Sequence, residues 1–240
     1  MNLEQLTVKI YADGAELTGM IEMAKNPLIK GFTTNPTLMR KAGIADYKKF
    51  AQEVIRAVPD RPISFEVFSD DFNEMYAQAM EIASWGGNVN VKVPVTNTRR
   101  EFAGDLISRL SSNGIFVNIT AIMHIGQVKA VMDNLRGDAP AYISVFAGRI
   151  ADTGRDPIPI MTEAAEISRT RSNTEVIWAS PRELINIFQA DQAGVQIITV
   201  ANDILNKLSL VGKDLGDYSL ETVQMFRNDA VKAGFSIPNS

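Results

Sequence analysis

The sequence predicts an α/β protein: a closed (β/α)8 barrel, or TIM barrel, with an additional C-terminal helix, formed as a single domain over residues 1–240. Three observations favour this fold. Eight short β-like runs alternate with segments of helical periodicity, and alternating βα units build parallel sheets with right-handed crossovers. Eight such units in 240 residues fit the usual length of a closed barrel. Polar residues also recur toward the carboxyl ends of the runs, where this architecture carries its active sites.

Each predicted strand is a short run of alternating or apolar residues. In chain order the strands are Leu6–Asp13, Ile29–Asn35, Pro62–Phe68, Asn88–Val95, Ile115–Thr120, Ala141–Phe146, Glu175–Ser180 and Val195–Val200. The alternative fold is an open, doubly wound sheet. No GxGxxG motif follows the first strand, which disfavours the dinucleotide-binding form of that sheet.

The predicted helices have apolar residues at helical spacing. In chain order they are Asp46–Ala57, Phe72–Ala83, Gly104–Leu110, Gly126–Leu135, Ile160–Arg169 and Pro181–Ala193. A last helix is expected over Ser219–Gly234, with Ser219 as its N-cap and Gly234 as its stop.

Composition narrows the classes of function. A net charge of −4 without blocks of like charge disfavours binding to nucleic acid or to a membrane surface. No apolar run is long enough to span a membrane, and the first residues lack the features of a signal peptide, so we expect a cytoplasmic protein. With no cysteine and one histidine, His124, the chain lacks the usual ligands of a catalytic zinc, and we expect no metal and no cofactor. The composition does allow a Mg²⁺ ion bound by carboxylates.

The run NVNVKVPV, Asn88–Val95, places a lysine on the parity opposite its valines. In a barrel this parity faces the interior, so Lys92 would meet polar residues from the other strands. These residues are Asp13, Asn35, Glu66, Asn118, Thr120 and Ser144. Half-exposed antiparallel strands would show the same alternation. Five strands with the pattern at the same end favour the barrel interior.

A lysine in that interior has a chemical use. Desolvation favours the neutral amine, which attacks carbonyl carbons and forms a Schiff base. Asp13 and Glu66 are placed to move protons, and Thr120 to position a water. Asn35, Asn118 and Ser144 would then hold substrate hydroxyls. The alternative for Lys92 is a structural ion pair with Asp13 or Glu66.

An anion site is predicted after the seventh strand. Ser180-Pro181-Arg182-Glu183 has the pattern of a capped helix N-terminus, which binds phosphate. Arg182 flanks this site, and Arg149, after the sixth strand, would be a second clamp. The alternative is that Ser180 and Glu183 only cap the helix and that Arg182 is a solvated surface charge.

Seven segments, in order and covering nearly the whole chain, resemble the transaldolases, in particular the short subfamily that includes fructose-6-phosphate aldolase. They are YADGAE (Tyr11–Glu16), KGFTTNPTL (Lys30–Leu38), VNVKVPVT (Val89–Thr96), VNITAIM (Val117–Met123), SVFAGRIAD (Ser144–Asp152), WASPRE (Trp178–Glu183) and AGVQIITV (Ala193–Val200). The resemblance implies a (β/α)8 barrel that transfers dihydroxyacetone from a ketose phosphate to an aldose phosphate without a metal.

The resemblance also implies roles for individual residues. Lys92 would form the Schiff base, Asp13 would transfer protons, and Glu66 would act through a water held by Thr120. The implied substrate-binding residues are Thr34, Asn35, Asn118, Ser144 and Phe146, with Arg149, Ser180 and Arg182 at the phosphate.

Two positions bear on the type of reaction. Aldolase members of the resembled family have Gln where this chain has Glu66 and Tyr where it has Phe146, so both positions favour a transferase. The chain departs from the family pattern at Val145, Trp178 and Pro181, near the acceptor and anion regions. These departures leave the identity of the substrate sugar undetermined. The alternatives are an aldolase that releases free dihydroxyacetone and a non-catalytic barrel that binds sugar phosphates. The resemblance further implies a ring-like homo-oligomer, such as a pentamer or decamer, that uses the C-terminal helix.

Overall fold

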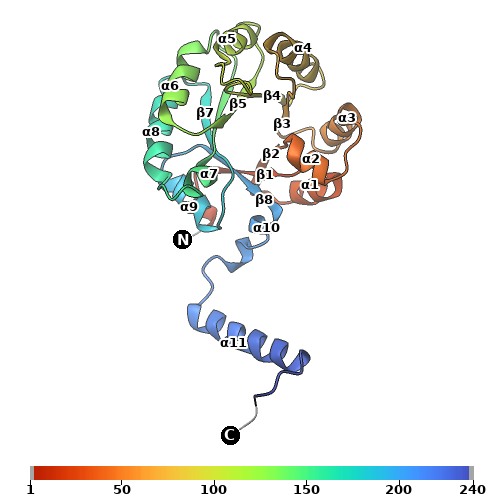
Figure 1. Ribbon diagram of the computed structural model, residues 1–240, viewed down its shortest axis with the longest axis vertical. Coiled ribbons are helices and arrows are strands. Elements are labelled where there is room, and N and C mark those ends of the chain that lie inside the picture. Colours follow the sequence, from red (N-terminus) through yellow and green to blue (C-terminus); the bar gives the residue numbers. More distant parts are fainter. Residues whose placement is uncertain (1–2, 238–240) are drawn as a thin grey trace.

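The computed structural model describes residues 3–237. Its centre is a closed barrel in which eight parallel strands follow one another in chain order and β8 pairs with β1. Figure 1 shows helices around the outside of this barrel and one further helix beyond it. The strands are β1 (Lys9–Asp13), β2 (Ile29–Thr33), β3 (Ile63–Glu66), β4 (Val89–Pro94), β5 (Val117–Ile122), β6 (Ala141–Val145), β7 (Thr174–Trp178) and β8 (Ile197–Ala201). The predicted fold class, a (β/α)8 barrel with an additional C-terminal helix, is therefore confirmed.

The helices are more numerous than the sequence pattern predicted. Those between the strands are α1 (Leu17–Ala24), α2 (Pro36–Lys41), α3 (Tyr47–Ala57), α4 (Phe72–Ala83), α5 (Gly104–Ser112), α6 (Ile125–Asn134), α7 (Ala147–Ala151), α8 (Ile158–Ser168) and α9 (Ile185–Gln192). After β8 come α10 (Asn202–Leu205) and α11 (Leu215–Lys232), and short 3-10 turns occupy Leu3–Gln5 and Leu208–Leu210. The helix predicted over Phe72–Ala83 has the bounds of α4. Helices α1, α2, α7 and α10 were missed, because helices of about one or two turns are too short to show a clear period.

Two predicted helix starts are wrong. Helix α9 begins at Ile185 rather than at Pro181, because the side chain of Asn186 reaches back and accepts hydrogen bonds from the backbone N–H groups of Arg182 and Glu183. Ser180 therefore caps no helix. Helix α11 begins four residues before the predicted Ser219 and is capped by Asp214, while Gly234 follows its end with a positive φ, as expected.

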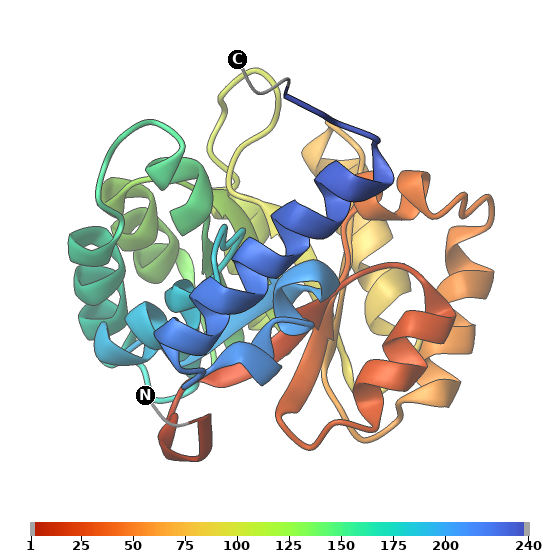
Figure 2. The same cartoon turned by 90° about the horizontal axis from the view of Figure 1, so that it is seen from below.

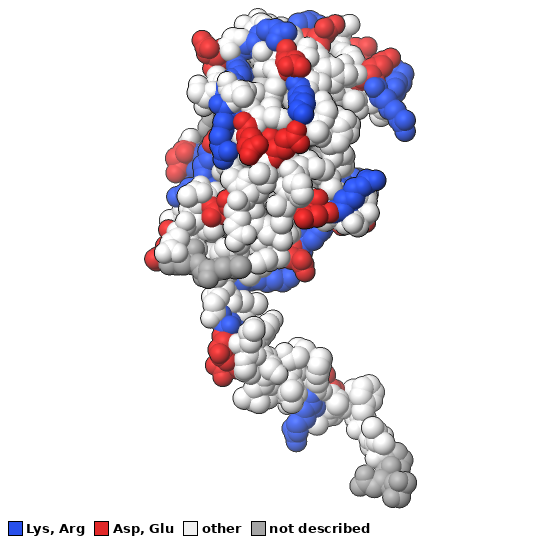
Figure 3. Space-filling model, turned by 90° about the vertical axis from the view of Figure 1, so that its left-hand side faces the viewer, with Lys and Arg blue, Asp and Glu red and all other residues white. Residues whose placement is uncertain are grey.

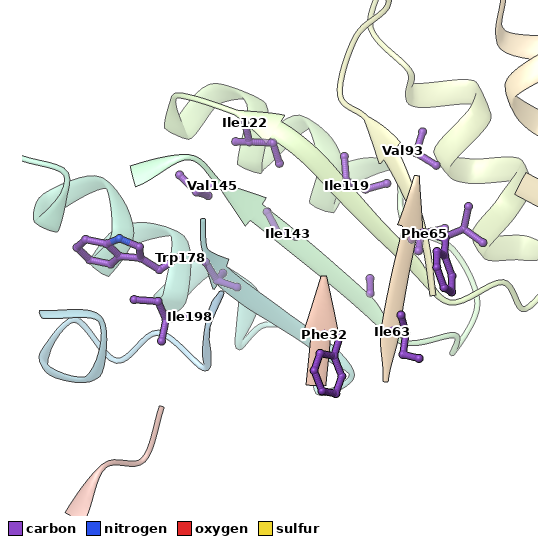
Figure 4. Close-up of a cluster of buried hydrophobic side chains, with 14 of the residues drawn as sticks. Phe32, Ile63, Phe65, Val93, Ile119, Ile122, Ile143, Val145, Trp178 and Ile198 are labelled. Atoms are coloured by element: carbon purple, nitrogen blue, oxygen red, sulfur yellow. The ribbon is translucent and has the colours of Figure 1, made fainter. Parts of the chain in front are cut away.

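The apolar parity of the strands faces the helices and builds the main core. Figure 4 shows this layer, with Phe32 and Phe65 at one side and Trp178 at the other. The opposite parity faces the barrel interior, as the alternation predicted. Burying the valine, isoleucine and aromatic side chains of eight strands against the helices is the dominant stabilising contribution.

The lower barrel interior is filled by side chains. The hydroxyls of Tyr11 and Tyr142 lie 2.7 Å apart, and Lys9 Nζ is 2.6 Å from the Glu175 carboxylate. Burial raises the pKa of Tyr142 to about 12, so this phenol stays neutral. Gly31 is required here, because a Cβ at this position would lie 2.5 Å from the Tyr11 ring. This filled layer lies below the cavity that opens at the carboxyl ends of the strands.

Helix α11 projects away from the barrel in Figure 1 and lies nearest the viewer in the view from below in Figure 2. None of its residues is buried. Acidic and basic side chains alternate over the barrel face in Figure 3, whereas uncharged atoms predominate along the projecting helix. No helix within residues 3–237 combines the length and the hydropathy needed to cross a membrane.

Candidate active site

A cavity of about 340 Å³ opens at the carboxyl ends of the barrel strands. It is lined by the predicted site residues Asp13, Asn35, Glu66, Lys92, Ser144, Phe146, Arg149 and Ser180. Four other predicted residues, Thr34, Asn118, Thr120 and Arg182, do not line it. The cavity wall also includes residues that the sequence pattern did not single out: Thr33, Thr37, Leu38, Lys41, Ala179 and Thr199.

Lys92 lies on β4 at the floor of this cavity and is 6 % exposed. The register of β3 and β4 sets Glu66 beside Lys92, and the Lys92 Nζ is 3.2 Å from Glu66 Oε2. Lys92 also donates a hydrogen bond of 3.2 Å to the backbone carbonyl of Thr34. Its amino group is thus held in one place by two oxygens and remains in contact with the cavity.

Asp13 ends β1 on the other side of the cavity floor. Its carboxylate accepts a hydrogen bond of 2.7 Å from Thr33 Oγ1, which also lies 2.5 Å from Thr199 Oγ1. Burial raises the pKa of the Asp13 carboxyl, while the nearby Lys92 and the hydrogen bond from Thr33 act in the opposite direction. A carboxyl group with a raised pKa beside an amine is suited to accepting and returning protons.

Asn118 is fully buried and holds Ser144 in place. Ser144 Oγ donates to Asn118 Oδ1 at 2.7 Å, and Asn118 Nδ2 donates to Ser64 Oγ at 3.0 Å. Ser64 Oγ in turn donates to Asn90 Oδ1 at 2.5 Å. Ser64 and Asn90 were not singled out, although both share the interior parity of their strands with Glu66 and Lys92. Because the Ser144 hydroxyl donates its proton to Asn118, its oxygen can only accept hydrogen bonds from a group in the cavity.

Three predicted residues bear on the cavity in different ways. Asn35 caps α2 through Oδ1, which accepts from the Leu38 backbone N–H, and so its amide nitrogen is the group left for a substrate. Thr34 donates its hydroxyl to the Ser64 carbonyl and contributes only its backbone oxygen to Lys92. Thr120 is buried, and its hydroxyl has no hydrogen-bond partner within the described part of the chain, which leaves it available to a water or a substrate group.

Helix α7 carries the cationic side of the cavity. Its Arg149 guanidinium lies over the Phe146 ring at 5.4 Å. The backbone of Gly148 passes so close to Ser180 that a Cβ would lie 1.5 Å from the Ser180 carbonyl oxygen. Ser180 itself has a φ of 61°, the strained left-handed region for a residue with a side chain. This close approach brings Arg149 and Ser180 to the same wall.

Arg182 was predicted to flank the anion site but does not line the cavity. Its guanidinium makes two hydrogen bonds to Asp152, with Nε 3.1 Å from Oδ1, and it lies outside the cavity wall. The predicted helix N-terminus at Ser180 is also absent, since α9 starts at Ile185. Arg182 reaches an anion in the cavity only by releasing Asp152.

Comparisons with known proteins show which family this chain resembles. The family model for transaldolase/fructose-6-phosphate aldolase matches residues 10–237. A probable transaldolase of Dehalococcoides mccartyi is 35% identical over 84% of this chain and 90% of its own. A probable transaldolase of a Thermoanaerobacter species is 33% identical over 96% of this chain and 100% of its own. Among solved structures, that of the citrate synthase SbnG aligns with a TM-score of 0.57 at 12% identity, covering 95% of each chain; this likeness concerns the fold alone.

Proposed function

Because the chain belongs to the transaldolase/fructose-6-phosphate aldolase family, we propose that it transfers a dihydroxyacetone unit from a ketose phosphate to an aldose acceptor through a Schiff base at Lys92. The observation that carries this proposal is the position of Lys92. Its buried amine lies at the cavity floor, 3.2 Å from Glu66 and on the same floor as Asp13.

The proposed reaction balances with the groups in the cavity. Lys92 passes one proton to Glu66 and its neutral amine adds to the ketone carbon; when Glu66 returns the proton to the departing hydroxyl, water leaves and a protonated imine remains. The protonated imine draws electrons from the bond between the carbon next to it and the hydroxyl-bearing carbon beyond. As this bond breaks, the proton of the hydroxyl on the departing carbon passes to Asp13 and an aldehyde leaves. The three remaining carbons stay on Lys92 as an enamine, which adds to the acceptor aldehyde by the same steps in reverse.

The remaining residues are assigned by their position in the cavity. Asn35 and Ser144 would contact substrate hydroxyls, with Asn118 acting through Ser144. Glu66 and Thr120 would hold the water that leaves and returns. Arg149 and Ser180 line the anion end, and Arg182 would join them by exchanging Asp152 for the anion.

Transfer rather than release is favoured by two cavity residues. An aldolase must protonate the enamine carbon and free the ketone, whereas a transferase must keep that carbon unprotonated until an aldehyde arrives. Phe146 lines the cavity with a ring that has no proton to donate, and Glu66 presents a carboxylate to the Lys92 amine. Both favour exchange of the three-carbon unit.

A comparison of two rates tests this choice. We predict that exchange between a ketose phosphate and an added aldose is much faster than formation of free dihydroxyacetone without an acceptor. Phe146→Tyr should raise the release rate, because a phenol can deliver a proton, and Phe146→Leu is the matched control without a hydroxyl. Comparable rates of release and exchange in the unmodified protein would favour the aldolase instead.

A further inference from the structure

Two basic side chains of the cavity wall are without a carboxylate partner. Lys41, the last residue of α2, and Arg149, in α7, both line the cavity, and neither forms an ion pair within residues 3–237. Helix α2 follows β2 and α7 follows β6. Since these strands are four places apart in a closed barrel of eight, the two cations approach the cavity mouth from opposite sides.

The charges in the cavity leave these two cations uncompensated. Its carboxyl groups are Asp13 and Glu66. Glu66 is paired with Lys92, and Asp13 lies near Lys92 at the cavity floor, where it accepts a hydrogen bond from Thr33. The cations of the cavity wall without a carboxylate partner in the described part of the chain are Lys41 and Arg149. A phosphate monoester carries about 1.5 to 2 negative charges at neutral pH and has three acceptor oxygens, so it matches this pair in charge.

Arg182 does not supply the second charge in this structure. Asp152 neutralises its guanidinium through two hydrogen bonds, and the side chain lies outside the cavity wall. Lys41 has no such competitor. Its flexible four-carbon stem can bring a point charge to an oxygen of a ligand at the mouth.

We propose that Lys41 and Arg149 clamp the phosphate of the sugar between them, and that Lys41 is the residue by which the cavity prefers phosphorylated over neutral sugars. This proposal rests on the proposed function for the identity of the ligand as a sugar. Its geometric basis is independent of it: two unpaired cations on opposite sides of one cavity mouth.

The test is the substitution Lys41→Met, which keeps the length of the side chain and removes its charge. Loss of one charged hydrogen bond at an accessible site should raise KM for a ketose phosphate about tenfold and leave kcat nearly unchanged. The same variant should act on the unphosphorylated ketose as the parent does. Arg40→Met is the matched control: it removes the same charge from the adjacent residue, which lines a separate surface groove.

The outcomes separate the clamp from the chemistry. Calorimetric titration with inorganic phosphate measures the anion site without turnover, and we expect weaker binding in Lys41→Met but not in Arg40→Met. Equal phosphate binding in the parent and Lys41→Met would overturn the clamp. So would a loss in Arg182→Met that exceeds the loss in Lys41→Met. If neither the parent nor any variant exchanges sugars, but phosphate binding is weaker in Lys41→Met than in the parent, the clamp stands and the proposed function fails.

Discussion

At the scale of single residues, the cavity floor holds two carboxyl groups in different environments. Glu66 is ion-paired with Lys92, whereas Asp13 is bonded to a neutral hydroxyl and is buried deeply enough for its pKa to be raised. Two carboxyl groups in different surroundings can take different roles in one site, one in proton transfer and the other in charge stabilisation. The proposed roles of Asp13 and Glu66 follow this division.

The raised pKa of Asp13 predicts a pH effect on stability. The folded protein keeps a proton on this carboxyl at pH values where the unfolded chain has lost it. The contribution of Asp13 to the free energy of unfolding therefore falls as pH rises from about 4 through its raised pKa. Asp13→Asn removes this loss, so the variant should gain stability over the parent as pH rises, while losing exchange activity.

Chemical denaturation of the parent and of Asp13→Asn at several pH values checks this expectation. Asp133→Asn, at an exposed carboxyl on α6, is the control and should follow the parent at every pH. An unchanged difference between the parent and Asp13→Asn across the pH range would contradict the assignment of a buried, proton-retaining Asp13.

At the scale of elements, α7 can approach the segment after β7 closely because Gly148 has no side chain. A Cβ there would meet the Ser180 carbonyl, which is backbone and cannot move aside cheaply. Gly148→Ala should lower the free energy of unfolding by about 1–3 kcal/mol, the usual cost of overpacking, and should displace Arg149 from the anion end. Denaturation and KM for a ketose phosphate measure both effects.

Gly87→Ala is the control for this element, because a Cβ at Gly87 meets nothing within 4 Å. It should leave both the free energy of unfolding and KM close to the parent values. If Gly148→Ala behaves in the same way, α7 does not depend on its close approach to Ser180.

The elements also show how far the sequence alone could lead. Strict alternation in Asn88–Val95 predicted that Lys92 faces the interior, and the same parity could have found Ser64 and Asn90. The start of α9 was mispredicted because Ser180 and Glu183 match a capping box, while the side chain of Asn186 takes both backbone N–H groups in the fold. The pairing of Arg182 with Asp152 joins residues 30 apart, and no local pattern signals it.

At the scale of the whole molecule, α11 is an 18-residue helix without a buried residue. Its large apolar side chains are exposed: Leu215, Tyr218, Leu220, Val223, Met225, Phe226 and Val231. At 100° per residue, polar Asp217, Glu221, Gln224 and Asn228 share the side opposite Leu215 and Phe226, and Leu220 and Val231 lie at the border of this polar side. Most helical stability in proteins comes from packing of an apolar face, so we expect α11 to pack against a partner.

We predict that a second copy of the chain covers this face and that the protein is a homo-oligomer. Light scattering should give a mass that is a multiple of 26.3 kDa. Phe226→Glu should shift the assembly toward smaller species, because it places a charge in the apolar face. Gln224→Glu adds the same charge on the polar face and should leave the assembly intact. A parent protein that is a monomer at all concentrations would contradict this prediction.

The most direct test of the account is to trap the bond at Lys92. Borohydride reduction in the presence of a ketose donor should fix the three-carbon unit to the protein, and mass spectrometry should find it on one peptide, at Lys92. The variant Lys92→Ala should fold, as judged by circular dichroism, and should show neither the adduct nor exchange activity. An adduct on another lysine, or active exchange in a protein that gives no adduct, would contradict Schiff-base chemistry at Lys92.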